Sequence, residues 1–231
     1  MGNGTDSITL TGTIADINLA LEGLTYDSNE NFNGPDQLSI TINDQGNTGD
    51  GGSLTEVANV AINVTPVNDA PVIDLDADDS AGTTGLDFTT SFVAGNGPVS
   101  VTGGAAVFDI DSTIQTLTIR ISNIQDGADE ILAVTSNPNI GSSSSSSTGL
   151  LRLFVGENAT NDDFRDVVNS LTYENVSATP DTTTREITFV ANDGARDSIV
   201  ATAFVWLTGD ITAPTAVNLS LIHISEPTRP Y

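Results

Sequence analysis

Carboxylates are the side chains of this sequence that are numerous enough to do chemistry. The 231 residues include 31 Asp and Glu against six Arg and no Lys, which gives a formal charge of -25. Cys is absent, and the one His, His223, lies near the C-terminus. Carboxylate oxygens are ligands that calcium prefers in proteins. Two interpretations therefore remain open: sites for divalent cations, or an acidic surface that keeps a secreted protein soluble.

The same composition excludes several functions. A nucleic-acid partner needs a basic surface that neutralises phosphates, and this chain has too few bases for one. No run of about 18 apolar residues is present, so we predict no membrane insertion. Without Cys or a native His, the remaining catalytic option is a pair of acids across a cleft. Because a repetitive β-structure offers no obvious cleft, we predict that the protein is not an enzyme.

The last residues of the chain differ in character from the rest. The segment from Leu219 to Tyr231 reads LSLIHISEPTRPY and holds the only His, one of the six Arg and two of the nine Pro. It resembles a translated sequencing-adapter read-through and is left out of the fold prediction. His223 is therefore not a catalytic candidate.

Two stretches of the chain repeat one pattern. Residues 13–27 align without a gap with residues 160–174, which lie 147 positions later, and both stretches contain Leu-Thr-Tyr followed by an acid. Two further pairs of segments match: 38–46 with 187–194, and 61–71 with 204–214. Internal repeats of this kind indicate an array of similar modules. We predict the C-terminal part of one repeat over 1–70, a complete repeat over 71–214, and the start of another plus the tail over 215–231.

Local patterns predict the elements of each repeat. A Thr-x-x-Asp start at Thr13 and again at Thr160 resembles a capping box and is followed by apolar helical spacing, so we expect one short helix per repeat. Elsewhere, apolar and polar residues alternate over short runs separated by turn residues. The runs that carry this alternation are 38–42, 86–92, 117–121 and 187–191. The prediction is an all-β fold of antiparallel sandwiches, with the serine run 142–147 as a flexible loop.

One sequence block resembles a known family. Val-Asn-Asp-Ala-Pro-Val at 67–72, with Leu-Thr-Tyr-Asp and Asn-Phe-Asn-Gly-Pro-Asp (31–36) before it, is similar to the cadherin-like tandem repeats of large bacterial adhesins of the repeats-in-toxin type. This resemblance implies Ig-like sandwiches that are chained head to tail and stiffened by calcium at their junctions. It also implies a secreted or cell-surface location. The expected partners are neighbouring repeats and a cell-surface protein or carbohydrate.

The resemblance also implies a set of calcium ligands. The family's linker element, acidic residue and Asp-x-Asp pair correspond here to Asn68, Asp69, Asp27, Glu174, Asp109 and Asp111. An Asp-x-Asp pair on an extended segment points two carboxylates the same way, which suits a cation that takes six to eight oxygens. The alternative for Asp109 and Asp111 is a polar turn before a core strand.

The second junction departs from the family pattern. Residues 209–214 keep Ala-Pro but lack Asn-Asp, so Glu174 has only Asp210 as an obvious linker partner. We expect a weaker calcium site there, or none. The acids at 74, 76, 78 and 79 are also dense in oxygens, but a strand start could simply place them in water.

A second functional hypothesis is a carbohydrate-binding accessory module of a secreted hydrolase. Such a module would use aromatic side chains exposed on one sheet face. Trp206 is the candidate, although its alternation with Phe204 favours a place in the core. Tyr26 and Tyr173 are expected to pack against the sandwich with their hydroxyls bonded nearby. Convergence of the predicted ligands would favour calcium, whereas an exposed Trp206 would favour sugar.

Overall fold

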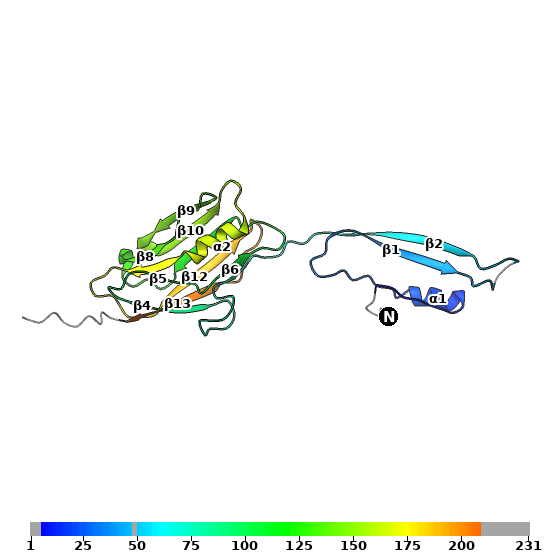
Figure 1. Ribbon diagram of the computed structural model, residues 1–231, viewed down its shortest axis with the longest axis horizontal. Helices are drawn as coiled ribbons and strands as arrows, with labels where there is room; N and C mark the ends of the chain where they lie inside the picture. The colour runs from blue at the N-terminus through cyan, green and yellow to red at the C-terminus, as the bar shows by residue number, and fades with distance from the viewer. Residues whose placement is uncertain (1–5, 48–49, 209–231) are drawn as a thin grey trace, which may run out of the picture. The chain divides into compact units, whose positions relative to one another are not determined.

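The computed structural model describes residues 6–47 and 50–208. The chain divides into two compact units, Met1–Val67 and Asn68–Tyr231, which are called unit 1 and unit 2 below. Most regular structure in both is β-strand (Figure 1). None of the helices in the described ranges is long and apolar enough to cross a membrane.

The described residues of unit 1 form one helix and one hairpin. Helix α1 (Ile14–Leu21) starts where the hydroxyl of Thr13 accepts the backbone N–H of Asp16 at 3.3 Å, as the Thr-x-x-Asp pattern predicts. Strands β1 (Gly34–Asn43) and β2 (Thr55–Val64) pair antiparallel. None of the described residues of this unit belongs to the buried apolar core.

Over residues 68–208, unit 2 is built from short strands in three sheets and one α-helix. The largest sheet has the order β4-β13-β12-β7-β10-β9, the second β5-β11-β8 and the third β3-β6. The strands are β3 (Val72–Asp74), β4 (Phe88–Val93), β5 (Val99–Ser100), β6 (Ala106–Phe108), β7 (Thr116–Ile121), β8 (Glu130–Ala133), β9 (Ile140–Ser145), β10 (Leu150–Val155), β11 (Thr172–Asn175), β12 (Arg185–Asn192) and β13 (Ala201–Thr208). Two 3-10 turns, η1 (Gly127–Asp129) and η2 (Ser146–Thr148), lie among them.

Helix α2 (Asn161–Asn169) begins with a complete capping box. The Thr160 hydroxyl accepts the N–H of Asp163, and the Asp163 carboxylate accepts the N–H of Thr160 at 2.9 Å. Hydrogen bonds from Thr160, and then from Asn137, lower the pKa of Asp163 to about 2. The helix turns Phe164, Val167 and Val168 into the core. The predicted short helix is thus confirmed in both units.

The core of unit 2 joins its sheets. Alternate residues of β7, β12 and β13 are completely buried, which matches the predicted period of two. Phe92 of β4 meets Tyr173 of β11 edge to face, with ring centroids 5.5 Å apart. This contact links the six-stranded sheet to the β5-β11-β8 sheet. The strand-rich fold class is confirmed to this extent.

Two details of the prediction are wrong. The serine run is not a loop, because its first residues form β9, which pairs with β10 from Ile140 to Ser145. Serine has little strand preference of its own, so pairing with a well-packed neighbour decides the conformation. In addition, β13 pairs with β4 in parallel, although the sandwich was predicted to be antiparallel. These strands lie far apart in sequence, and no short hairpin constrains their direction.

Each unit has a hairpin after its helix, and the two hairpins have the same strand register. The aligned residues pair in one register: Leu38 with Val60 and Ile40 with Ala58 in unit 1, Ile187 with Ala203 and Phe189 with Ala201 in unit 2. The sequence match therefore extends to strand pairing. It covers the helix and the hairpin of each unit.

Candidate metal centre

The predicted Asp-x-Asp pair lies in the loop between β6 and β7. The Oδ1 atom of Asp109 accepts the backbone N–H groups of Asp111 (3.2 Å) and Ser112 (3.1 Å). Its Oδ2 atom is buried without a hydrogen-bond partner among the described residues, and so is the Oγ atom of Ser112. Buried polar atoms in proteins are nearly always paired. These two atoms therefore mark the loop as a candidate ligand site.

Asn161, the first residue of α2, holds this loop in place. Its Nδ2 atom donates to the carbonyl oxygens of Asp109 (3.2 Å) and Ser112 (3.0 Å), and its Oδ1 atom accepts the N–H of Ile114 at 2.9 Å. One amide thus fixes both ends of the Asp-x-Asp turn. Sequence reasoning missed Asn161, and its place directly after the helix cap was the signal that could have found it.

The segment that leads into β3 docks against the same loop. The backbone N–H of Asp69 donates to Oδ2 of Asp111 at 3.0 Å. The Nδ2 atom of Asn68 donates to its neighbour's carbonyl oxygen at 2.6 Å and to Oδ2 of Asp193 at 2.7 Å. Arg196 donates to the carbonyl oxygen of Asn68 at 3.2 Å. Residues 68–69 are therefore tied to two loops of unit 2.

Asp193 anchors this segment from the turn after β12. Its Oδ1 atom accepts the N–H groups of Ala195 and Arg196, both at 2.6 Å. Burial acts to raise the pKa of Asp193, but the hydrogen bonds from Arg196, Asn68 and Ala195 outweigh it and hold this pKa below its ordinary value. The bond between Asn68 and Asp193 joins residues 125 positions apart, so the sequence did not indicate it.

Four predicted ligands therefore meet at one end of unit 2: Asn68, Asp69, Asp109 and Asp111. They offer oxygen atoms only, which is the donor chemistry that calcium takes. However, no group of three or more Asp, Glu, His or Cys in residues 6–47 and 50–208 is placed to hold a metal ion. The donor types fit calcium, whereas the distances form no closed coordination sphere.

The other two predicted ligands lie elsewhere. Glu174 is on β11, next to Asn175, which bonds Asp126 at 2.7 Å near the start of β12. Since Asp193 follows the end of β12, a strand of eight residues and so about 25 Å long, Glu174 is at the opposite end of unit 2. Its expected partner Asp210 lies outside the described residues. Asp27 belongs to unit 1, where it is exposed.

The dense acids after β3 shape a loop instead of facing water together. Asp76 is completely buried and accepts the hydroxyl of Ser80 at 3.1 Å and the N–H of Ala81 at 2.7 Å. Asp79 caps the same loop by accepting the N–H of Gly85 at 3.1 Å. The expectation of a solvated cluster is thus wrong for Asp76, because the loop folds back over it.

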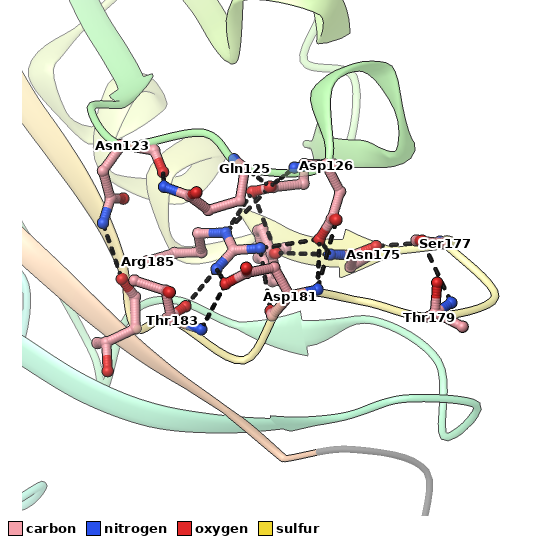
Figure 2. A network of polar contacts seen from close by, with 12 residues as sticks. Asn123, Gln125, Asp126, Asn175, Ser177, Thr179, Asp181, Thr183 and Arg185 are labelled. Atoms are coloured by element: carbon pink, nitrogen blue, oxygen red, sulfur yellow. Dashed lines mark hydrogen bonds and ion pairs between the residues drawn. The ribbon is translucent and has the colours of Figure 1, made fainter.

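A buried ion-pair network surrounds Arg185, near Asp126 and Asp181 (Figure 2). The Nη2 atom of Arg185, the first residue of β12, lies 2.9 Å from Oδ2 of Asp126, and its Nε atom contacts Glu130. The hydroxyl of Tyr173 donates to Glu130 at 3.2 Å. Burial, and then the charge of Glu130, raise the pKa of Tyr173. Every charged group here has a partner, so the network is structural.

Trp206 lies on the outer face of the six-stranded sheet and is 57% exposed. The prediction that it is a core residue is wrong, because β13 turns its small residues Ala201 and Ala203 inward instead. On the same face, strands β7 and β10, which lie two and three places from β13 in the sheet, carry Arg120 and Arg152, both exposed and without an ion pair in the described ranges.

Comparison with known proteins adds no family assignment. No protein-family model matches the chain, and no curated protein matches it either.

Proposed function

We propose that this protein is a calcium-binding structural module, non-catalytic and part of a secreted or cell-surface adhesive protein. The observation that supports the proposal best is the buried Oδ2 atom of Asp109, which has no partner among the described residues. A buried carboxylate oxygen without a partner costs free energy that a bound cation would offset. The resemblance of residues 67–72 to cadherin-like bacterial repeats supports the same ion.

The residues that would hold calcium are Asp109, Asp111, Asp69 and Asn68. The ion would supply two positive charges among carboxylates that otherwise repel one another. Two of these residues come from the entering segment and two from the β6–β7 loop, so binding would fasten the segment to unit 2. In a chain of charge -25, each site that offsets carboxylate repulsion stiffens the structure.

A mechanical role follows from this attachment. A module whose entering segment is fixed projects whatever it carries in a defined direction, while a loose segment lets it swing. The partners would be neighbouring repeats of the same chain and, at the adhesive end, a cell-surface protein or carbohydrate. This role needs no nucleophile, base or cleft.

Calcium titration of the full chain tests the proposal directly. Binding should be observed by calorimetry, and the melting temperature should rise with calcium compared with chelator. Magnesium at the same concentration should give a smaller rise, because it demands a stricter geometry and keeps its waters. Equal melting temperatures in calcium and chelator would contradict the proposal.

The exposure of Trp206 favours a second candidate, binding of carbohydrate to the outer sheet face. An exposed Trp offers a flat ring for a sugar, and Arg120 and Arg152, farther across the same sheet face, can donate hydrogen bonds to hydroxyl or carboxylate groups. Affinity electrophoresis in gels that contain neutral or uronate polysaccharides tests this candidate. Retardation that is lost in Trp206→Ala would support it, and unchanged migration of the wild type would exclude it for those polymers.

A further inference from the structure

The hairpin of unit 1 has an apolar face. The register places Leu38, Ile40 and Ile42 of β1 on one side together with Ala58 and Val60 of β2. In unit 2 the equivalent residues are Ile187, Phe189, Ala191, Ala201 and Ala203, and all are completely buried. The same pattern of side chains is therefore core in one unit and surface in the other.

The difference in exposure is large at several aligned positions. Ile42 is 61% exposed, whereas the aligned Ala191 is 0% exposed. Tyr26 is 47% exposed and its counterpart Tyr173 is 0% exposed. Helix α1 buries no residue, although α2 buries three. Neighbouring exposed apolar side chains such as these, flanked on the same face by Asp36 and Glu56, mark an interaction site.

Unit 2 shows what makes that contact. There, the edge of β12 that does not face β13 pairs with β7, and the edge of β13 that does not face β12 pairs with β4. Strands β4 and β7 both belong to the segment 72–155, which also supplies buried residues such as Ile73, Val101 and Leu153 to the core. Within the described residues, β1 and β2 pair only with each other.

We propose that the apolar face of unit 1 is covered by a segment with the strand pattern of residues 72–155, joined to the N-terminal side of unit 1. The N-terminal position follows from the topology of unit 2, in which residues 72–155 directly precede the helix cap at Thr160. The covering segment adds strands to both free edges of the hairpin. Unit 1 then becomes a second complete module of the unit 2 kind.

One aligned position sets the chemistry of this segment. Asp36 occupies the place of Arg185, since they pair with the aligned residues Ile62 and Val205. In unit 1 the hydroxyl of Tyr26 donates directly to Asp36 at 2.6 Å, whereas in unit 2 Glu130 lies between Tyr173 and Arg185. A Glu at the place of Glu130 would face Asp36 and repel it. The covering segment therefore carries a cation or an amide there.

Hydrogen exchange in an extended chain tests the proposal. A copy of residues 72–155 is fused ahead of Thr9 in the full chain, with Asp36→Arg to restore the charge pair. The backbone amides of β1 should exchange about 100-fold more slowly than in the unextended chain, because a second strand now engages them. With native Asp36 the protection should be weaker, because Glu130 of the added copy would then face Asp36 and repel it.

A matched control separates covering from mere extension. The added copy carries Leu117→Asp and Ile119→Asp, whose counterparts in unit 2 are completely buried against the hairpin. This chain should show no protection of β1. Equal exchange in the intact and the control extension would overturn the proposal. Protection of the unextended chain that increases with its concentration would also overturn it, by showing that a second copy covers the face.

Discussion

The Nε atom of Arg185 lies 3.0 and 2.9 Å from the two carboxylate oxygens of Glu130, and both side chains are completely buried. The rest of the guanidinium bonds Asp126 and the carbonyl oxygens of Thr183 and Asp181. A single Arg thus ties β8, the loop before β8 and the loop between β11 and β12 to β12. Buried charges are tolerated when every polar atom is bonded, as here.

Removing this arginine should be severe. Arg185→Leu leaves Glu130 as a buried, uncompensated charge, and we expect a loss of about 3–5 kcal/mol in the free energy of unfolding. Urea unfolding followed by circular dichroism measures it. The control is Arg120→Leu on the outer face of the same sheet, which should change stability by less than about 0.5 kcal/mol. Equal losses in the two variants would show that the network does not hold the loops.

The sequence predicted those elements whose signals are local. The Thr-x-x-Asp starts located both helices, because the cap is a bond between residues three apart. Alternation located β1, β7 and β12, since the period of two is visible in the residues themselves, although only β7 and β12 bury one side. The match between 38–46 and 187–194 extended to the strand register.

Features that depend on distant residues could not be predicted in this way. The serine strand β9 exists through its partner β10, and nothing within the run indicates it. Glu130 and Arg185 are 55 positions apart. A charged residue is predicted to be exposed unless an oppositely charged partner is known, because unpaired charges are almost never buried. Trp206 was expected in the core because it alternates with Phe204, but alternation alone does not tell which face of β13 points inward.

The residues of the candidate site were predictable from the sequence, but the residues that position them were not. The resemblance named Asn68, Asp69, Asp109 and Asp111, and the structure places them together. Asp193 and Asn161, which position them, come from other turns of the fold. Their bonds span 125 and 52 positions, respectively, so only the folded chain reveals them.

The pKa of Asp193 predicts a dependence of stability on pH. Because this pKa is lower in the folded chain than its ordinary value of 3.8, the stabilising effect is fully present above that value and is lost as pH falls through the folded pKa. Asp193→Ala should cost about 1.5–3 kcal/mol at pH 7, from lost hydrogen bonds to a charged group. The gap from wild type should shrink below about pH 4.

Chemical denaturation at several pH values measures this gap. Asp129→Ala is the control, since Asp129 is exposed and its side chain accepts no hydrogen bond within the described ranges. Its effect should be small at every pH. A gap for Asp193→Ala that stays constant down to pH 2 would contradict the assignment of the bonds to its carboxylate.

The change in melting temperature caused by Asp109→Asn should have opposite signs in chelator and in calcium. In chelator the variant should be as stable as wild type or more so, because a buried oxygen without a partner loses its charge. In calcium it should melt a few degrees lower than wild type, because a ligand is gone. Asp129→Asn, at the other end of unit 2, should behave like wild type in both. A loss of stability for Asp109→Asn that is the same in calcium and chelator would indicate a structural role alone.

The chain has one Trp, so its fluorescence reports a single position. Since Trp206 is largely exposed, its emission should lie near that of Trp in water, and acrylamide should quench it readily in the folded state. Trp206→Ala should lower stability by only about 0.5 kcal/mol or less, in contrast to the 3–5 kcal/mol typical of a buried Trp. Phe92→Ala, at the completely buried ring that meets Tyr173, serves as the contrast on the adjacent strand and should cost that larger amount. A blue-shifted, poorly quenched emission would place the ring inside the fold and remove the support for a sugar-binding face.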